Sequence, residues 1–386
     1  MNILFLAPHP FYQERGTPIA VRLLLKVLSC RGDHVDVVTY HEGDDVALPG
    51  VVFHRIPRLP GIRNIRPGFS LKKLVCDAFM LALALRLVRR KKYHLVHAVE
   101  EAAFIGLLIK RCFGIPYVYD MDSSLSRQMV DKSFLFRPLA PLMRYLEGRV
   151  VNHALAVVPV CDALAAIARR HQPRQVWILR DISLLAVIDN RDGAAVEDLR
   201  LVGTRFMYIG NLESYQGIDL LLRSFSLFHK KCNDATLAIV GGSPRDVAYY
   251  QARIVRYGID EFVRFTGPRP LSMMSGLFRQ ADVLVSPRIR GVNTPMKIYS
   301  YLQSGKPILA TDLPTHTQVL TSDLAVLVPP TARRFAEAMR QLADDPDRRR
   351  QLARRAMALV DEKYSLPVFE RSAHELYQWL EAQVLP

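Results

Sequence analysis

The sequence is poor in cysteine, and its few cysteines are not spaced for a metal site or a disulfide framework. Five occur in 386 residues, an odd number, and no two stand in a CxxC motif. They are Cys30, Cys76, Cys112, Cys161 and Cys232, mostly within apolar segments. We therefore expect buried, reduced thiols in a reducing compartment, and no zinc site.

The sequence also lacks a hydrophobic run long enough to cross a bilayer. Its longest apolar helical stretch, residues 74–88, is interrupted by Asp77 and Arg86 and falls short of the roughly 20 residues that a transmembrane helix needs. The opening MNILFLAPHP has no basic segment before its short apolar run, which predicts a first β-strand rather than a signal peptide. No transmembrane segment is predicted.

Acidic residues are the scarcer charge. The sequence has 52 Lys and Arg against 37 Asp and Glu, a formal net charge of +15. Between Arg55 and Lys92 there are eleven basic residues and one acid, Asp77. We expect a basic face on the N-terminal half and an anionic partner. Nucleic acid is not predicted as that partner, because no recognised binding motif and few aromatic residues accompany the basic run.

The chain does contain a regular alternation of short β-rich runs and helical patterns. In the N-terminal half the runs are NILFLA, HVDVVTY, VVFHRI, HLVHA, PYVYD, ALAVVP and QVWIL. In the C-terminal half they are RFMYIG, ATLAIVG, FVRFTG, DVLVSP, PILAT and LAVLV. This alternation predicts an α/β protein with two doubly wound, Rossmann-like domains, each a parallel sheet covered by helices.

The predicted parts are an N-terminal domain at 1–186, a linker at 187–204, a C-terminal domain at 205–365 and a final helix at 366–386. The linker loses apolar periodicity and gathers Asp, Asn and Gly. Charged helical patterns occupy 332–344 and 347–363, and Pro367 opens the final helix. In an open α/β sheet the loops after the strands bind ligands, so candidate site residues are sought there.

Residues 285–312, VSPRIRGVNTPMKIYSYLQSGKPILATD, predict a strand, a loop, a capped helix and a second strand. Asn293 and Thr294 are good N-cap residues, and Pro295 suits the first helical position. The first amides of such a helix lack intrahelical partners and carry the positive end of its dipole, so they form a seat for an anion. Lys297 lies in the first turn, where a cation is favoured only if an anion is bound.

This segment resembles the donor-binding segment of family-4 retaining glycosyltransferases, which have the GT-B fold. The family form is EGxPxxxxEAMAxGxPVVA, and alignment on Pro295 places Val292 and Ser300 where its two glutamates would stand. The segments YIGNLESYQGIDLLLRSF, IVGGSP and FTGPRP match further family loops in order. The resemblance covers essentially the whole chain. It implies two domains facing a cleft, an acceptor-side N-terminal domain, a C-terminal domain for a nucleotide sugar, and a final helix that crosses back.

The resemblance also implies donor-side residues. Arg15 and Gly16 stand where the family commonly has two glycines near the donor phosphate, although Arg15 also fits a solvated residue beside a helix cap. The implied donor-binding residues are Gly16, Gly210, Asn211, Gln216, Gly241, Gly267, Arg288, Asn293, Thr294, Met296 and Ser300. Asn211 and Gln216 replace an Arg and a Lys that bind the diphosphate. The cations that remain are Arg15, Arg288, Arg290 and Lys297, of which Lys297 is the principal candidate.

In the N-terminal half, Glu100 and Glu101 follow a strand and begin a helix, where a capping role and an acceptor-binding role are both open. Asp120 and Asp122 follow the next strand. Many family members carry a histidine in this loop, and Asp122 is our candidate for its replacement. The DxD spacing could hold a divalent ion, but GT-B sites neutralise diphosphate with helix ends and cations, so we predict no metal and no cofactor. The isolated histidines His9, His94, His97 and His316 fit core or loop positions.

We predict a glycosyltransferase that moves a sugar from a nucleotide-diphosphate sugar to an acceptor hydroxyl, with retention if the resemblance holds. Lys297, Asp122 and Arg15 are the candidate catalytic residues. The departing phosphate oxygen can take the acceptor proton, so a strong protein base is dispensable. Neutral residues at four expected functional positions keep open a non-catalytic GT-B protein that binds a nucleotide or a partner. A GT-B isomerase or phosphorylase is a further alternative.

Residues 70–92 predict an amphipathic helix. Its apolar stripe is Leu71, Leu74, Val75, Ala78, Leu81, Ala82, Leu85 and Val88, with basic residues at both ends. We expect the apolar centre to face the core. The flanking charge, with a further apolar and basic segment at 132–137, is expected to attract an anionic leaflet. The sequence thus predicts a peripheral enzyme on the cytoplasmic face of the cell membrane, with a lipid-linked or membrane-borne glycan acceptor.

Overall fold

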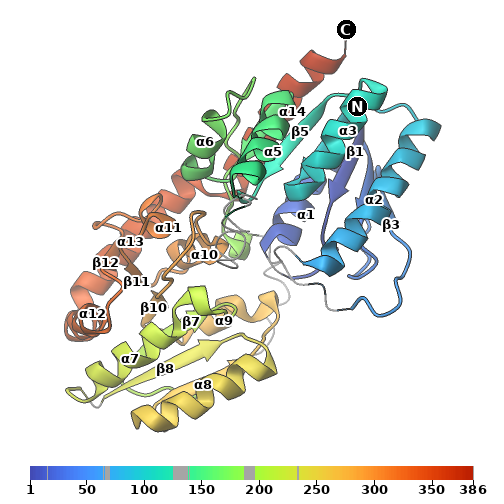
Figure 1. The fold of residues 1–386 in the computed structure, drawn as a ribbon. Coiled ribbons are helices and arrows are strands. Elements are labelled where there is room, and N and C mark those ends of the chain that lie inside the picture. Colours follow the sequence, from blue (N-terminus) through green and yellow to red (C-terminus); the bar gives the residue numbers. More distant parts are fainter. Residues whose placement is uncertain are drawn as a thin grey trace. The chain divides into compact units, whose positions relative to one another are not determined.

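The computed structural model describes residues 1–14, 16–63, 65, 70–124, 138, 140–186, 196–232 and 234–385. The chain forms two compact units. Unit 1 is Met1–Arg180 with Phe369–Pro386, and unit 2 is Asp181–Val368. Each unit contains one six-stranded parallel sheet with helices packed beside it (Figure 1). The predicted pair of doubly wound α/β domains is confirmed.

In unit 1 the strand order is β3-β2-β1-β4-β5-β6. The strands are β1 (Asn2–Ala7), β2 (His34–Thr39), β3 (Val51–Arg55), β4 (Leu95–Val99), β5 (Tyr117–Met121) and β6 (Ala156–Pro159). The helices are α1 (Gly16–Cys30), α2 (Leu71–Arg90), η1 (Glu100–Ala102), α3 (Ala103–Phe113), α5 (Ala140–His153), α6 (Asp162–Arg169) and α14 (Leu366–Val384).

In unit 2 the strand order is β12-β11-β10-β7-β8-β9. The strands are β7 (Thr204–Ile209), β8 (Ala235–Val240), β9 (Val263–Gly267), β10 (Val283–Ser286), β11 (Ile308–Thr311) and β12 (Ala325–Val328). The helices are η3 (Leu184–Ala186), η5 (Ser214–Gln216), α7 (Ile218–His229), α8 (Pro244–Tyr257), η6 (Leu271–Met273), α9 (Met274–Arg279), α10 (Met296–Gln303), α11 (Pro314–Thr317), α12 (Ala332–Asp344) and α13 (Pro346–Lys363).

The two sheets share one topology, since each reads third, second, first, fourth, fifth, sixth strand across the sheet. The order reverses between β1 and β4 in unit 1 and between β7 and β10 in unit 2. In sheets of this kind ligands bind outside the carboxyl ends of the strands at the reversal. The loops after these four strands are therefore the places where a site is expected.

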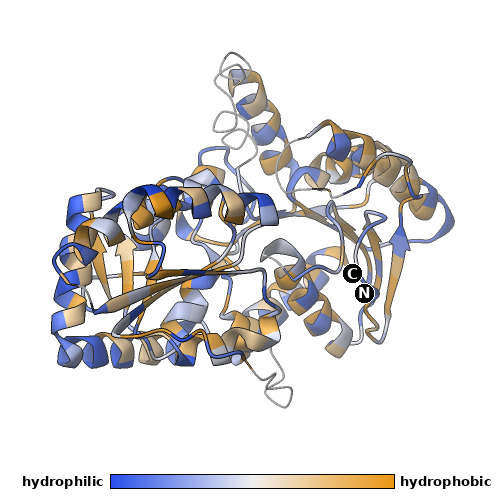
Figure 2. Cartoon of the chain, turned by 90° about the horizontal axis from the view of Figure 1, so that it is seen from below, coloured by the Kyte–Doolittle hydropathy of each residue, from blue (hydrophilic) through white to orange (hydrophobic). Residues whose placement is uncertain are grey.

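The strands supply the centre of each core. All residues of β4, β5, β6 and β8 are buried, as expected for parallel strands with both faces covered. Figure 2 shows the same pattern, because the strands are coloured mainly hydrophobic and the helices change colour from face to face. In α12 the buried residues include Phe335, Met339 and Leu342, which share one helical face.

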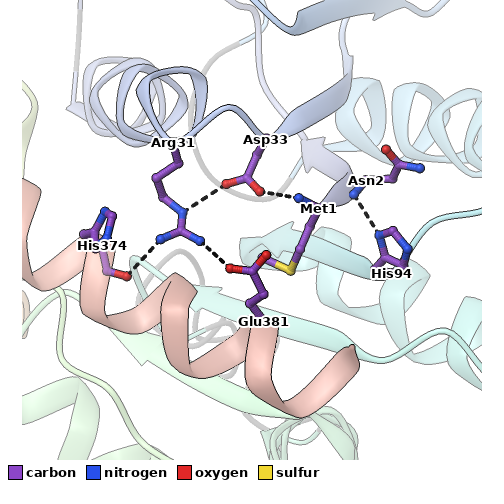
Figure 3. A network of polar contacts seen from close by, with 7 residues as sticks. All are labelled: Met1, Asn2, Arg31, Asp33, His94, His374 and Glu381. Atoms are coloured by element: carbon purple, nitrogen blue, oxygen red, sulfur yellow. Dashed lines mark hydrogen bonds and ion pairs between the residues drawn. The ribbon is translucent and has the colours of Figure 1, made fainter. Parts of the chain in front are cut away.

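The end of the chain is part of unit 1 through polar contacts to the turn after α1. The guanidinium of Arg31 donates to Asp33 at 3.1 Å, to Glu381 on α14 at 3.0 Å and to the carbonyl oxygen of His374 at 3.4 Å (Figure 3). Asp33 also accepts from the amino group of Met1 at 2.6 Å. These contacts fix α14 against the amino end of the first sheet.

Deeper in unit 1, α14 is held by a buried chain of hydrogen bonds. The hydroxyl of Tyr377 and Nδ1 of His97 are 2.7 Å apart, and Nε2 of His97 lies 3.1 Å from Asp120. His97 also stacks on Phe5, with ring centroids 4.4 Å apart. Asp120 is 9% exposed, and its carboxylate is paired with His97. His97 is a core histidine, as predicted.

The boundary between the units differs from the predicted one. It falls between Arg180 and Asp181, whereas the sequence placed it after Ala186. The reason is that η3 packs within unit 2, where the backbone N–H of Leu184 donates to the buried hydroxyl of Ser300 at 3.0 Å. Much of the predicted linker, residues 187–195, lies outside the described residues.

Two other predictions need correction. Residues 175–179 are not a sheet strand, since Val176 forms only an isolated bridge with Val157 of β6. Cys30 and Cys112 are exposed rather than buried, because both lie at the ends of helices. Within the described residues, no helix combines the length and the hydropathy needed to cross a bilayer.

Helix α2 is oriented opposite to the prediction. Its buried residues are Lys73, Cys76, Met80 and Ala84, and the predicted apolar stripe lies on the outer side. Leu71 is 78% exposed and Leu74 is 47% exposed. The rotation of α2 follows from polar contacts on its inner side, which are described below, rather than from its most apolar face.

Candidate functional site

In unit 2, the loops after β7 and β10 meet at the point where the strand order reverses. Gly217, with φ +77°, approaches the second loop so closely that a Cβ there would lie 2.0 Å from the carbonyl oxygen of Pro287. A Cβ on Gly210 would lie 3.2 Å from Nζ of Lys297. Glycine at both positions therefore permits the packing of the two loops against the start of α10.

Lys297 lies in the first turn of α10 and reaches back to the β7 loop. Its Nζ donates to Oε1 of Gln216 at 3.0 Å and lies 4.0 Å from the centroid of the Tyr208 ring. Burial, and the nearby positive charge of Arg288, hold the pKa of Lys297 well below its usual range. A bound anion would reverse this effect, because an opposite charge favours the protonated amine.

Arg288 is the second cation of the site and is only 7% exposed. Its guanidinium donates to the carbonyl oxygen of Arg290 at 2.7 Å and to Oδ1 of Asn293 at 3.2 Å, and it lies over the Tyr215 ring. A Cβ on Gly291 would lie 2.1 Å from a guanidinium nitrogen, so only glycine leaves room for this arrangement. Burial lowers the pKa of Arg288.

Neither Lys297 nor Arg288 is paired with a carboxylate among the described residues; their partners are amide and carbonyl oxygens and aromatic rings. Buried cations in proteins are normally paired, because removing a charge from water without compensation is costly. Two adjacent cations without an acid, beside a helix start, form a site whose chemistry suits an anion.

A neutral histidine lies in the hydrogen-bond network next to Arg288. His316, on α11, is fully buried, and burial lowers its pKa to about 3. Its Nε2 lies 2.8 Å from the hydroxyl of Ser286, and its Nδ1 lies 2.9 Å from the carbonyl oxygen of Thr311. The hydroxyl of Thr311 donates to the carbonyl oxygen of Arg288 at 2.5 Å. The uncharged network therefore fixes the backbone of Arg288 without adding charge.

The predicted cap of α10 is wrong in detail. Helix α10 begins at Met296, and Pro295 is its N-cap with no side-chain hydrogen bond. Asn293 does not cap because its side chain accepts from Arg288. Thr294 does not cap either; its hydroxyl is buried and has no hydrogen-bond partner among the described residues. A ligand oxygen could satisfy it.

The other donor-side candidates fall into two groups. Gly210, Gly241 and Gly267 adjoin one another at the ends of β7, β8 and β9, since the N–H of Gly241 donates to Gly267 at 2.8 Å and a Cβ on Gly241 would meet the Gly210 carbonyl oxygen at 2.1 Å. Asn211 is exposed beside them. Ser300, in contrast, is fully buried, and its hydroxyl is used by Leu184.

In unit 1, the loops after β4 and β5 also meet. Oε1 of Glu100 accepts from the hydroxyl of Ser123 at 3.0 Å, and Asp122 is half-buried directly after β5. Neither Glu100 nor Glu101 caps a helix with its side chain, because the N-cap of α3 is Ala102 and makes no side-chain bond. Gly16 opens α1, whereas Arg15 lies outside the described residues.

Glu101 is held by a buried ionic cluster that the sequence did not indicate. Lys73, on α2, forms an ion pair with Glu101, and the hydroxyl of Tyr40 donates to Asp77 at 2.5 Å. Burial raises the pKa of Glu101 to about 7 and that of Asp77 to about 6. Both carboxyl groups therefore hold a proton more readily than an exposed acid does, because burial disfavours their charged forms.

Among the described residues, no three histidine, cysteine or acidic side chains are grouped so as to hold a metal ion.

Sequence comparison covers both units. Residues 15–179 match the glycosyl transferase 4-like domain, and residues 203–345 match the glycosyl transferases of group 1. The chain belongs to the family-4-like glycosyltransferases. The phosphatidyl-myo-inositol mannosyltransferase of Mycobacterium leprae is 23% identical to this glycosyltransferase over 341 residues, 85% of this chain and 83% of the relative.

Solved structures agree with the assignment. Sucrose-phosphate synthase from Thermosynechococcus elongatus superposes on the glycosyltransferase with a TM-score of 0.80 at 19% identity, covering 99% of both chains. HepE from Anabaena, solved in complex with UDP, superposes with a TM-score of 0.73 at 15% identity, covering 98% of this chain and 100% of that one. The protein therefore has a GT-B fold, and the family matches make it a glycosyltransferase.

Proposed function

We propose that this glycosyltransferase holds the diphosphate of its nucleotide-sugar donor against Lys297 and Arg288, and passes the sugar with retention to a hydroxyl of a lipid-linked or membrane-borne glycan. The observation that carries the proposal is a pair of cations, Lys297 on α10 and Arg288 after β10, with no carboxylate partner among the residues that the structure describes. A diphosphate supplies the missing negative charge.

The proposed chemistry needs charge stabilisation more than a strong base. As the bond between the sugar and the diphosphate breaks, negative charge grows on the departing phosphate oxygen. The groups proposed to stabilise it are Lys297, the first amides of α10 and the buried hydroxyl of Thr294. That oxygen accepts the proton of the acceptor hydroxyl as the new bond forms on the same face of the sugar. Gln216 and Asn211 add neutral contacts.

The acceptor proposal draws on unit 1 and on a relative. Glu100 and Asp122, at the carboxyl ends of β4 and β5, are polar groups at the positions where an open α/β sheet binds its ligand. The related mannosyltransferase is named for a phosphatidyl-inositol acceptor. Asp122 and Arg15 keep their proposed catalytic roles on the family resemblance alone, and we propose that the reaction needs no metal ion.

The test is a transfer assay with a panel of nucleotide-diphosphate sugars and a membrane lipid extract as acceptor. The anomeric configuration of the purified product is read by proton NMR. We expect one donor to be consumed and the product to keep the donor's configuration; inversion would overturn retention. If thermal shifts showed binding of a nucleotide sugar while no donor was ever consumed, the non-catalytic alternative would hold instead.

A further inference from the structure

Helix α2 carries apolar side chains on its outer face. Leu71 is 78% exposed, and Leu74, Val75 and Phe79 are 47%, 43% and 40% exposed. With 3.6 residues per turn, these four side chains and the exposed Ala78 and Ala82 lie on one side of the helix. A continuous apolar strip of this kind on a surface usually marks a place where something binds.

The strip faces outward because polar contacts fix the rotation of α2. On the inner side, Lys73 pairs with Glu101, and Asp77 accepts from Tyr40. At the N-terminus, the hydroxyl of Ser70 accepts from the backbone N–H of Lys73 at 3.2 Å. Turning the strip inward would break a buried ion pair, so the outward position of the apolar residues is imposed by the fold.

The strip ends in positive charge. Arg86, Arg89 and Arg90 are exposed in the last turns of α2, and Lys92 is exposed just beyond. The single acid of α2, Asp77, is on the inner side, and all residues of α2 are described. The outer face of α2, defined as Leu71, Leu74, Val75, Phe79, Arg86, Arg89 and Arg90, is therefore apolar at one end, basic at the other and free of acids.

We propose that the outer face of α2 docks on an anionic phospholipid bilayer, with Leu74, Val75 and Phe79 in the interfacial layer and Arg86, Arg89 and Arg90 against the headgroup phosphates. The reason for choosing a lipid surface is charge complementarity between the basic end of this face and anionic headgroups. A second copy of the chain would bring two basic surfaces together without an acid on either face, and a nucleic acid would leave the apolar end unmatched.

The inference goes beyond the proposed function, since docking requires no donor. It would place unit 1 at the inner face of the cell membrane, next to a lipid-borne acceptor. Arg55, Lys73 and Lys91 do not contribute, because the structure uses them for internal contacts with Phe11, Glu101 and Asp36. The predicted docking residues at 132–137 lie outside the described part of the chain.

The experiment is co-sedimentation of the full chain with vesicles of phosphatidylcholine alone, or of equal parts phosphatidylcholine and phosphatidylglycerol. Wild type should bind the anionic vesicles at least about tenfold more tightly, and salt should weaken the binding. The variants Leu74→Ser/Val75→Ser/Phe79→Ser and Arg86→Gln/Arg89→Gln/Arg90→Gln should each lose most of it. Circular dichroism melting establishes that these surface variants are folded.

Two matched controls lie in unit 2. Arg354→Gln/Arg355→Gln removes an exposed basic pair from α13, and Val255→Ser removes a side chain that is 64% exposed on α8. Both controls should bind vesicles like wild type. Equal binding of wild type to the two kinds of vesicle, or unchanged binding of the apolar triple variant, would overturn the proposal.

Light scattering without vesicles tests the second-copy alternative. A wild-type dimer that the apolar triple variant converts to a monomer would assign the face to self-association and overturn lipid docking; a monomeric wild type is expected. Nucleoside-diphosphate release from the donor should be unchanged in the α2 variants, because none of their residues belongs to the donor site. Loss of docking with intact release would therefore leave the proposed function standing.

Discussion

Lys73 and Lys297 are both lysines in confined surroundings. In the described part of the chain, Lys73 has a carboxylate partner, Glu101, whereas Lys297 has none. Removing one partner of a buried pair leaves the other charge uncompensated. We expect Lys73→Met to lower the free energy of unfolding by about 3–5 kcal/mol. The neighbouring Lys72→Met, at an exposed position whose amine donates to the carbonyl oxygen of Arg63, should stay within about 0.5 kcal/mol. Urea unfolding measures both; a loss below about 1 kcal/mol for Lys73→Met would mean that the pair is not formed.

Glu101 and Asp77 predict a pH dependence of stability. Their pKa values are about 7 and about 6 in the folded protein, above the ordinary values of 4.5 and 3.8. Between these limits the two carboxyl groups bind more protons in the folded state than in the unfolded state, so their contribution to stability is greatest at low pH and is lost as pH rises through the folded values. Unfolding free energies at about pH 5 and about pH 8 should show this loss.

The control for that pH effect is a carboxyl that is already exposed. Glu101→Gln should flatten the pH dependence, because the amide does not titrate, whereas Glu375→Gln on α14 should leave it unchanged. If the stability of Glu101→Gln changed from pH 5 to pH 8 as much as that of wild type, the assignment of the raised pKa values to this cluster would be contradicted.

For individual residues, the sequence predicted only part of the candidate site. Lys297 could be predicted because its position in the first turn of a helix is a local property, and Arg288 because it follows a strand. Tyr208, Tyr215 and His316 could not, since their roles depend on contacts between segments far apart in the chain. Lys73 was hidden for the same reason: in the sequence it is one base in a basic run, and only the fold brings Glu101 to it.

Among the elements, the loop after β10 shows how backbone conformation positions a functional side chain. Gly291 has φ +124° and its missing Cβ leaves space for the guanidinium of Arg288. We expect Gly291→Ala to lower turnover at least tenfold, about 1.4 kcal/mol, because it displaces Arg288. Gly61, with φ +76° and nothing within 4 Å of its Cβ position, is the matched control. Gly61→Ala should cost about 1 kcal/mol of stability and leave turnover unchanged. Equal turnover for both variants would remove Arg288 from the donor site.

Helices with a strong local signal were predicted closely. The charged helices at 332–344 and 347–363 appear as α12 and α13, and the final helix appears as α14. The rotation of α2 was not predicted, because its most apolar side was assumed to face the core. Ionic contacts on its less apolar side determine which side faces the core. The spacing of apolar residues in the sequence does not indicate such contacts. The prediction of the N-cap of α10 was wrong for a similar reason, because the side chain of Asn293 accepts a hydrogen bond from Arg288.

For the whole molecule, the alternation of strands and helices predicted both sheets, because parallel strands are buried on both faces and therefore read as short apolar runs. The same regularity fixes where ligands bind. In unit 2 the loops that meet at the reversal of strand order bring Gln216 to Lys297, and in unit 1 the loops after the neighbouring strands β4 and β5 bring Glu100 to Ser123. The specificity for the sugar, the nucleobase and the acceptor depends on individual side chains, which the general rules of the fold do not predict.

Lys297 and Arg288, which have no carboxylate partner among the described residues, are proposed to bind the donor diphosphate. Steady-state turnover of the identified nucleotide sugar by Lys297→Ala tests this proposal most directly. We predict a fall of at least tenfold, about 1.4 kcal/mol of transition-state stabilisation, with an unchanged circular dichroism spectrum. Lys230→Ala, at an exposed position after α7, should turn over like wild type. Wild-type turnover by a folded Lys297→Ala protein would contradict the account.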